Sequence, residues 1–165
     1  MADYKLMAKQ IEALAEAERY FMPVLANASA ILSDGMEHIN WVGFYLMDKG
    51  SLLLGPFQGK AACIRIEVGR GVCGTAVQEN RVIRVEDVHA FPGHIACDSA
   101  SRSEIVLPIH SRGKIAGVLD IDSPETGRFT EEDEAGLQAV VKAIETATDF
   151  SLLRKQTSLH AIDEI

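Results

Sequence analysis

Two aspartates, Asp120 and Asp122, stand two positions apart in a segment whose apolar, β-branched residues predict a β-strand. Because side chains alternate across a strand, both carboxyl groups leave the same face, next to Val118. Such a pair can bind a cation, share a proton or hold a substrate ammonium group. Acidic residues are mostly exposed, so a solvated strand end is the commoner explanation of an isolated pair. An EF-hand calcium loop is excluded, because counting from Asp120 places Glu125 where that loop needs glycine.

A thiol, Cys97, lies in a long polar loop over residues 87–102, three positions after His94. Loops of this length are frequently functional. The imidazole can lower the pKa of the thiol or bind a metal, although a solvated histidine fits the spacing as well. Of the two other cysteines, Cys73 falls in a predicted amphipathic helix, where burial as a small apolar side chain is usual. Cys63 is therefore the preferred partner if Cys97 forms a redox pair.

Trp41, Gly43 and Tyr45 share one face of another predicted strand, and the glycine leaves a gap between two aromatic side chains. The gap fits the floor of a binding pocket, and aromatic walls suit an apolar or thioether group. Core packing of the single tryptophan explains the same pattern. Both interpretations stay open at this point.

Gly69, Gly71 and Gly74 match the G-x-G-x-x-G pattern of dinucleotide-binding folds, with Glu86 after the next predicted strand. Such a fold needs strands and helices that continue to alternate around a parallel sheet. The flanking segments instead have the turn residues of hairpins. We therefore interpret the glycines as tight-turn residues and keep a nucleotide-dependent oxidoreductase as a weaker alternative.

The elements that must position these residues follow from the hydrophobic pattern. Helical spacing predicts helices over residues 4–14, 21–32 and 72–78, with a break near Pro23 between the first two. Aromatic and β-branched residues predict strands, at residues 39–47, 51–57, 64–68, 82–85, 104–110 and 114–121. A last helix begins after the capping residue Thr130 and is expected to continue past residue 150. This order predicts an α+β fold, with a mostly antiparallel sheet and the terminal helices packed mainly on one face.

The composition limits the classes of function. The chain has 165 residues, of which 47% are hydrophobic and 24% charged, so we expect a single globular domain over residues 1–165. The net charge of -8 disfavours nucleic acid and anionic membranes as partners. The polar N-terminus and the lack of a long apolar run predict a cytoplasmic protein. Three cysteines without a C-x-x-C pair predict neither a disulfide framework nor a structural zinc site.

Six short motifs together resemble the free methionine-(R)-sulfoxide reductases, a family of stand-alone GAF domains. They occupy residues 39–45 (INWVGFY), 54–60 (LGPFQGK), 69–76 (GRGVCGTA), 93–98 (GHIACD), 103–108 (SEIVLP) and 117–123 (GVLDIDS). The resemblance extends over residues 20–145. It implies a GAF fold, reduction of free methionine (R)-sulfoxide to methionine, and no bound cofactor or metal.

The resemblance also assigns roles to the three thiols. Cys97 matches the family's nucleophile, Cys63 its resolving cysteine, and Cys73 a third, less essential thiol close to the substrate. On this assignment, Cys97 attacks the sulfoxide sulfur and becomes a sulfenic acid, which condenses with Cys63 to a disulfide. The family hands this disulfide to thioredoxin, which thioredoxin reductase and NADPH keep reduced.

The other matched positions would form the substrate pocket. Glu104 and Asp122 match carboxyl groups that polarise the sulfoxide oxygen, and Asp120 is the natural partner of the substrate's α-ammonium group. Trp41 and Tyr45 match aromatic residues of the pocket wall. A carboxyl group that donates a proton near neutral pH needs a raised pKa, which we expect from clustering in a partly enclosed pocket.

Two further expectations concern partners and the competing class. The apolar stripes of the terminal helices fit a homodimer as well as packing within one chain. The main alternative function is a non-catalytic GAF-type sensor, which would use the same pocket to bind a small molecule or to respond to redox state.

Overall fold

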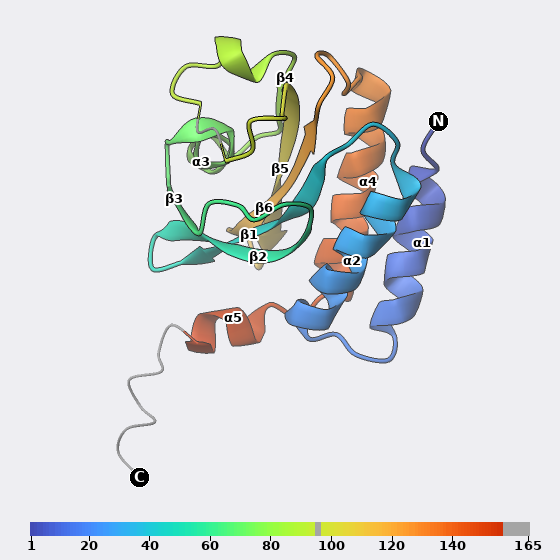
Figure 1. The fold of residues 1–165 in the computed structure, drawn as a ribbon. Helices are drawn as coiled ribbons and strands as arrows, with labels where there is room; N and C mark the ends of the chain where they lie inside the picture. The colour runs from blue at the N-terminus through green and yellow to red at the C-terminus, as the bar shows by residue number, and fades with distance from the viewer. Residues whose placement is uncertain (95–96, 157–165) are drawn as a thin grey trace.

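The computed structural model describes residues 1–94 and 97–156 and has one central sheet. The sheet has six strands in the order β3-β2-β1-β6-β5-β4, and every neighbouring pair is antiparallel (Figure 1). The strands are β1 Trp41–Asp48, β2 Ser51–Gln58, β3 Arg65–Glu67, β4 Ile83–Val85, β5 Ser103–Ser111 and β6 Lys114–Ser123. The predicted α+β class and the mostly antiparallel sheet are thereby confirmed.

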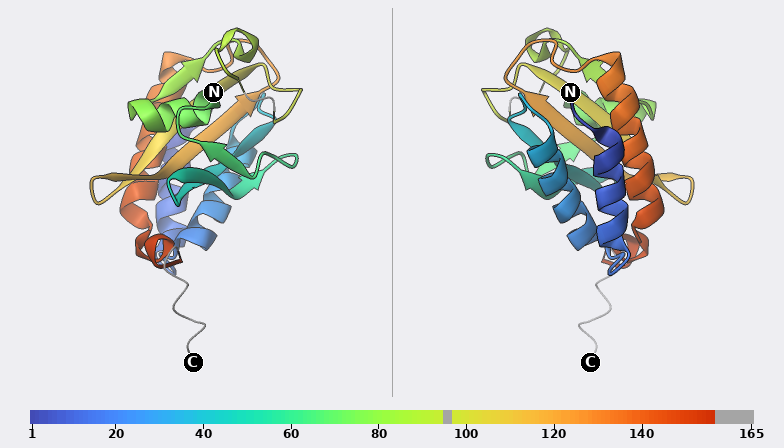
Figure 2. Two further views of the ribbon diagram at one scale, coloured as in Figure 1. Left: turned by 90° about the vertical axis from the view of Figure 1, so that its left-hand side faces the viewer. Right: turned by 90° about the vertical axis from the view of Figure 1, so that its right-hand side faces the viewer.

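The helices form unequal layers on the two faces of the sheet. Three long helices cover one face, as the right-hand view of Figure 2 shows: α1 Tyr4–Ala15, α2 Phe21–Gly35 and α4 Glu131–Ala147. The other face carries α3 Gly71–Glu79 and the long loop with the short 3-10 helix η1 Val88–Ala90. A short α5, Ser151–Gln156, follows α4. The larger apolar core lies under the three long helices, and a smaller one lies between the sheet and α3.

Helix α4 begins where the sequence predicts and ends earlier. Thr130 and Asp133 form a reciprocal capping box at its start. The expectation that this helix continues past residue 150 is wrong, because the backbone becomes extended at Thr148. The next amide, that of Asp149, donates to the carbonyl of Arg19. A tertiary hydrogen bond to the start of the chain thus replaces the next helical turn.

The break between the first two helices also differs from the prediction. It falls at residues 16–20, and Pro23 lies in the first turn of α2. Proline is tolerated there because the first turn of a helix has no internal acceptor for its amide groups. Throughout the described residues, every helix is too short or too polar to span a bilayer.

Candidate active site

A pocket lies on the face of the sheet that carries α3. Its walls come from strands β1, β5 and β6, from α3, and from the two loops that precede β3 and β5. Seven of the eight residues that the sequence singles out line it: Trp41, Tyr45, Cys73, Cys97, Glu104, Asp120 and Asp122. The eighth, Cys63, lies beside the pocket and is bonded to one of its lining residues. The fold therefore brings together residues that are up to 81 positions apart.

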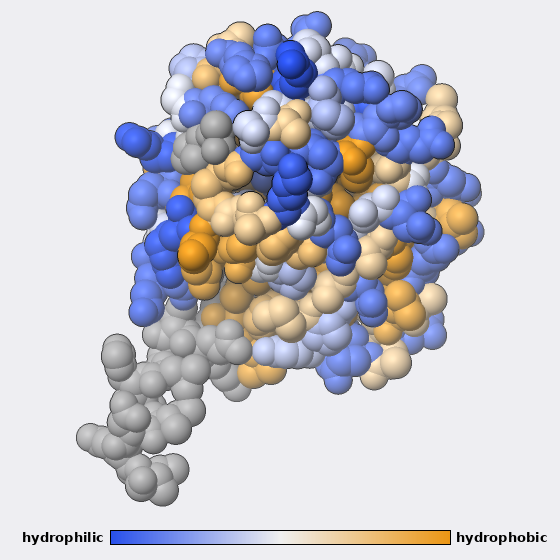
Figure 3. Space-filling view, viewed as in Figure 1, coloured by the Kyte–Doolittle hydropathy of each residue, from blue (hydrophilic) through white to orange (hydrophobic). Residues whose placement is uncertain are grey.

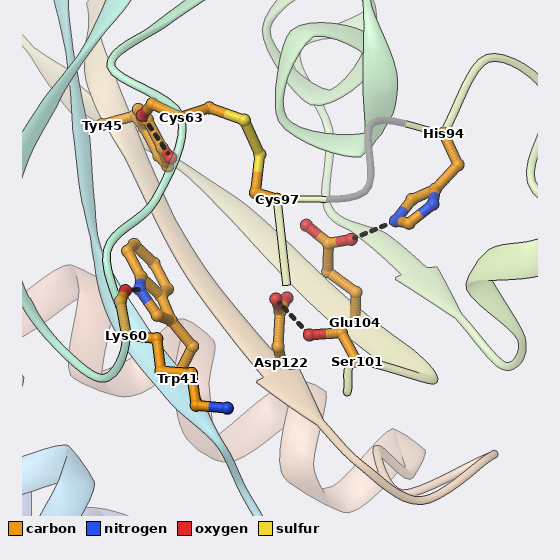
Figure 4. The surroundings of a disulfide bond; sticks show 9 residues. All are labelled: Trp41, Tyr45, Lys60, Cys63, His94, Cys97, Ser101, Glu104 and Asp122. Atoms are coloured by element: carbon orange, nitrogen blue, oxygen red, sulfur yellow. Dashed lines mark hydrogen bonds and ion pairs between the residues drawn. A yellow bond between two sulfur atoms is a disulfide. The ribbon is translucent and has the colours of Figure 1, made fainter. Parts of the chain in front are cut away.

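Cys63 and Cys97 form a disulfide that joins the two loops. Their Cα atoms are 5.6 Å apart, inside the usual range for a disulfide, and 34 positions separate them in the sequence. Cys97 lines the pocket whereas Cys63 does not. The hydroxyl group of Tyr45 donates to the carbonyl of Cys63 at 2.9 Å, which anchors one end of the bridge to β1 (Figure 4).

Strand register gathers the three carboxyl groups. Glu104 on β5 lies directly opposite Asp122 on β6, and Asp120 is on the same face two residues earlier. A solvated strand end is wrong for Asp120, which is only 6% exposed. Asp122 is partly exposed, but its Oδ1 atom is buried. The hydroxyl group of Ser101 donates to Oδ2 of Asp122 at 2.8 Å.

Burial governs the protonation of this cluster. It raises the pKa of Glu104 well above its usual value, and the nearby Asp120 and Asp122 raise it further. The pKa of Asp122 is also raised well above its usual value, first by burial and then by Asp120. Burial likewise raises the pKa of Asp120, although hydrogen bonds from its neighbours act in the opposite direction. The pocket therefore holds protonated carboxyl groups at a pH where exposed ones are ionised.

The cluster has room for a cation or a proton donor. Oδ1 of Asp120 and Oδ1 of Asp122 are buried without a hydrogen-bond partner among the described residues. Within the described chain, the nearest basic side chain to the three carboxyl groups is His94, whose Nε2 is 4.0 Å from Oε2 of Glu104. Burial lowers the pKa of His94, so its imidazole is held neutral more readily than in water. A positive group of the ligand would satisfy the unpaired oxygens.

Cys73 faces this cluster from α3. Its side chain is buried, and burial, followed by Asp120 and Glu104, raises the pKa of its thiol well above the usual value. A protonated thiol is a poor nucleophile. The ligand atoms of Cys73, Glu104 and Asp120 lie within 4.8 Å of one another, a spacing that also suits a metal ion. Their raised pKa values favour protons at these positions.

The aromatic wall differs from the predicted gap. The ring of Trp41 stacks on Tyr45 at 5.9 Å and on Phe57 at 5.2 Å between ring centroids. A Cβ atom at Gly43 would overlap Phe57 and the Trp41 ring, so these side chains already occupy the space beside Gly43. Gly43 therefore permits close packing and does not form the pocket floor. The indole nitrogen of Trp41 donates to the carbonyl of Lys60 at 3.1 Å, which holds the loop before β3.

Sequence reasoning did not single out the polar residues that hold the Cys97 loop. The side-chain amide of Asn40 donates to Oδ2 of Asp98 at 3.0 Å and to the Ser101 hydroxyl at 3.1 Å. His94 was noted beside Cys97, but its approach to Glu104 was not expected. Asn40 gives no local signal of such contacts, because its partners Asp98 and Ser101 lie about 60 positions away in the sequence.

The glycine motif has the predicted structural role. Gly69 and Gly71 have positive φ values of 85° and 62°, which glycine adopts without strain. A Cβ atom at Gly74 would clash with the carbonyl of Glu67. Strands β3 and β4, on either side of α3 in the sequence, lie at opposite edges of the sheet. The motif is therefore a tight turn into a helix and not part of a dinucleotide-binding βαβ unit.

Comparison with known proteins places the chain in a family. Residues 7–147 match the GAF domain. A protein of Escherichia coli (strain K12) described as free methionine-R-sulfoxide reductase is 57% identical over 150 residues, which cover 89% of this chain and 91% of that protein. A Saccharomyces cerevisiae protein with the same description is 41% identical, covering 84% of this chain and 82% of that protein.

Solved structures agree with this placement. The Staphylococcus aureus fRMsr structure in complex with substrate is 52% identical, has a TM-score of 0.85, and covers 90% of this chain and 97% of that one. A substrate complex of free methionine-R-sulfoxide reductase from Neisseria meningitidis is 44% identical, with a TM-score of 0.83 and 87% of each chain covered. This chain therefore belongs to the GAF-domain family and, within it, to the free methionine-R-sulfoxide reductases, which are oxidoreductases.

Proposed function

We propose that this protein reduces free methionine (R)-sulfoxide to methionine, with Cys97 as the nucleophile and Cys63 as the resolving thiol. The observation that carries the proposal is the disulfide between these two residues at the wall of a pocket that holds three clustered carboxyl groups, of which Glu104 and Asp120 are buried. A sulfoxide needs an attacking thiolate and an acid at its oxygen, and this pocket offers both.

In the first step, the thiolate of Cys97 attacks the sulfoxide sulfur while a carboxyl group protonates the oxygen. Glu104 and Asp122 suit this role because burial keeps their pKa values raised. The oxygen passes to the sulfur of Cys97 as a sulfenic acid, and methionine leaves with its sulfur reduced by two electrons.

In the second step, the thiol of Cys63 attacks the sulfur of Cys97. The sulfenic oxygen leaves as water, and the disulfide that forms is the one in this structure. Thioredoxin then returns two electrons to the bridge, drawn from NADPH through thioredoxin reductase. The enzyme needs no bound cofactor in this cycle, which we place in the cytoplasm.

Substrate recognition follows from charge and shape. Asp120 binds the α-ammonium group of the substrate, whose positive charge satisfies the unpaired oxygen of that carboxyl group. Trp41 and Tyr45 contact the side chain of the substrate from the aromatic wall. A methionine sulfoxide residue inside a protein has no α-ammonium group and therefore binds poorly.

A coupled assay tests this proposal directly. NADPH oxidation is followed with thioredoxin and its reductase, and the substrates are free methionine (R)-sulfoxide, the S-epimer and an N-blocked sulfoxide. We expect wild-type protein to consume the free R-epimer alone. Cys97→Ser should be inactive, whereas reduced Cys63→Ser should release one equivalent of methionine and then stop.

Two results would contradict the proposal. Repeated thioredoxin-driven turnover by Cys63→Ser would remove Cys63 as the sole resolving thiol, and Cys73 would be the obvious substitute. Tight binding of a ligand in titration calorimetry, without consumption of any sulfoxide, would instead favour the GAF-type sensor.

A further inference from the structure

The disulfide has an inner and an outer partner. Cys97 lines the pocket, between Cys63 and the carboxyl groups in the view of Figure 4, whereas Cys63 lies outside the pocket lining. Both residues are partly exposed. A macromolecular reductant is too large to enter the pocket, and Cys63, on the side of the bond away from the carboxyl groups, is the partner that lies outside the pocket lining.

The residue after Cys63 is unusually exposed for its type. The side chain of Ile64 is 72% exposed, more than any other large apolar residue of the described chain except Met1. Val68, at the other end of β3, is 37% exposed. Figure 3 shows apolar side chains gathered on this face, over β2 and β3. Isolated exposed apolar residues are common, but Ile64 directly follows Cys63 in the chain, and Val68 follows the short strand that begins beside it.

The charge around Ile64 differs in sign from that of the whole molecule. Residues 60–70 contain Lys60, Arg65 and Arg70 but a single acidic residue, Glu67, whereas the net charge of the chain is -8. Arg65 is paired with Asp48 at 2.8 Å. Neither Lys60 nor Arg70 has an ion pair with any described residue within 4.0 Å, although Arg70 also lines the pocket, and hydrogen bonds together with the charge of Lys60 lower the pKa of Asp98. An apolar centre with cationic neighbours fits a partner with an apolar contact area and an acidic rim.

We propose that Ile64, Val68, Lys60 and Arg70, here named the β3 surface, form the docking site of a thioredoxin-type dithiol protein whose thiolate attacks Cys63. The inference rests on the proposed function, because it takes the disulfide to be the oxidised state of the catalytic cycle. Beyond that function, the inference states where the reductant binds and which sulfur atom the reductant attacks.

The exchange balances as two substitutions at sulfur. The partner's thiolate attacks Sγ of Cys63, and the bond to Cys97 breaks, so that Cys97 leaves as a thiolate inside the pocket. The partner's second thiol, after losing its proton, attacks the partner's own sulfur in the mixed disulfide. Cys63 then leaves and takes up the proton. The partner is oxidised to a disulfide, and this protein gains two electrons.

The docking test follows reduction of the oxidised protein and needs no sulfoxide. Stopped-flow fluorescence of Trp41, the single tryptophan of this chain, measures the rate constant with reduced thioredoxin and, separately, with dithiothreitol. We expect Ile64→Glu to lower the second-order rate constant with thioredoxin at least about tenfold, because it removes a central apolar contact and repels an acidic rim. The rate constant with dithiothreitol should stay unchanged.

Matched variants separate docking from general effects. Leu14→Glu introduces the same charge at an apolar residue that is 51% exposed on α1, in the opposite layer of the fold. A second pair tests the role of charge: Lys60→Glu changes the β3 surface, and Lys9→Glu makes the same change on α1 as its control. We expect Leu14→Glu and Lys9→Glu to behave like wild type, and Lys60→Glu to slow thioredoxin alone. If both members of each pair lowered the rate constant with thioredoxin equally, the proposed docking site would be wrong.

A trapping experiment identifies the attacked sulfur. Thioredoxin whose second cysteine is changed to serine is mixed with the oxidised protein, and peptide mass spectrometry locates the mixed disulfide. Attachment at Cys63 is expected, and attachment at Cys97 would overturn the proposed direction of attack. Loss of sulfoxide reduction with these docking results intact would contradict the proposed function alone.

Discussion

Asp120 combines burial with an unpaired oxygen. The side chain is 6% exposed, and its Oδ1 has no hydrogen-bond partner in the described part of the chain. Leaving such an oxygen unsatisfied costs about 1–3 kcal/mol of folding free energy. A bound ligand that donates to this oxygen offsets that cost. A protein that needed only stability would have an apolar residue here. The position therefore supports a role in binding.

Replacing Asp120 by asparagine should raise the KM for free methionine (R)-sulfoxide about 30-fold or more, because a buried charge pair with the α-ammonium group is lost. The value of kcat should change much less. An N-acetylated sulfoxide is the control, since it lacks the positive charge. The difference in KM between the free and the N-acetylated sulfoxide should be smaller for the variant than for wild type. An unchanged KM with a collapsed kcat would show that the role of Asp120 is chemical.

Pairing among β1, β6 and β5 supplies the geometry of the pocket. Trp41 lies opposite Asp122 across β1 and β6, and Glu104 lies opposite Asp122 across β5 and β6. One strand, β6, thus places an aromatic wall on one side of the carboxyl groups and an acid on the other. The hairpin connection between β5 and β6 fixes the pairing of Glu104 with Asp122, and a shift of one residue there would move each side chain to the opposite face.

Gly43→Ala tests how closely β1 and β2 must pack beside the pocket. The new Cβ atom would lie 2.9 Å from the Cα atom of Phe57 and 2.8 Å from the Trp41 ring, so the backbone of β2 must shift. Overpacking of this kind costs about 1–3 kcal/mol of unfolding free energy. Urea denaturation followed by Trp41 fluorescence measures the loss. Wild-type stability together with a wild-type KM would contradict the close packing of this wall.

The acidic cluster in the pocket differs in its environment from the other acidic residues of the molecule. Glu104, Asp120 and the thiol of Cys73 are buried on the α3 face, next to the partly exposed Asp122, whereas most of the acidic residues are exposed and account for the net charge of -8. The three long helices cover the other face and carry the larger apolar core. Stability from that core permits the α3 face to keep groups whose ionisation opposes folding.

This arrangement predicts that stability falls with rising pH. The folded state raises the pKa of Glu104 above its usual 4.5, so the folded protein holds the proton more tightly than the unfolded chain does. The contribution is complete below pH 4.5 and is lost as the pH rises through the raised pKa. Within that window the loss is about 1.4 kcal/mol per pH unit for one carboxyl group.

Glu104→Gln removes this titration, and its unfolding free energy should therefore fall less steeply between pH 5 and 8 than that of wild type. Urea denaturation of the oxidised protein at intervals of about one pH unit measures the slope. Glu12→Gln, at an exposed position on α1, is the matched control and should follow wild type. Equal slopes for all three proteins would show that Glu104 is not protonated in the folded state.

Much of the fold was predictable because its signals are local. The capping box at Thr130, the alternation of residues in the strands and the turn glycines at Gly69 and Gly71 each depend on residues a few positions apart. The misplaced break near Pro23 has a local cause, because proline fits the first turn of α2, whereas the error at the end of α4 arose where distant segments interact. Asp149 pairs with the backbone of Arg19, and this contact ends α4 earlier than its apolar pattern predicts.

The sequence by itself determined the chemistry that this protein has available. Six motifs in order carry the resemblance to the family and assign the site residues, and the same-face spacing of Asp120 and Asp122 and the three thiols mark groups that can do chemistry, because residue identity and short spacing carry that information. Only the tertiary structure decided how those groups are placed relative to one another and which of them are protonated. Register across β5 and β6 set Glu104 against Asp122, burial raised their pKa values, and Phe57 and Trp41 filled the space beside Gly43. Protonation and pocket shape depend on distances and on exclusion of water, and contacts between residues far apart in the chain create both.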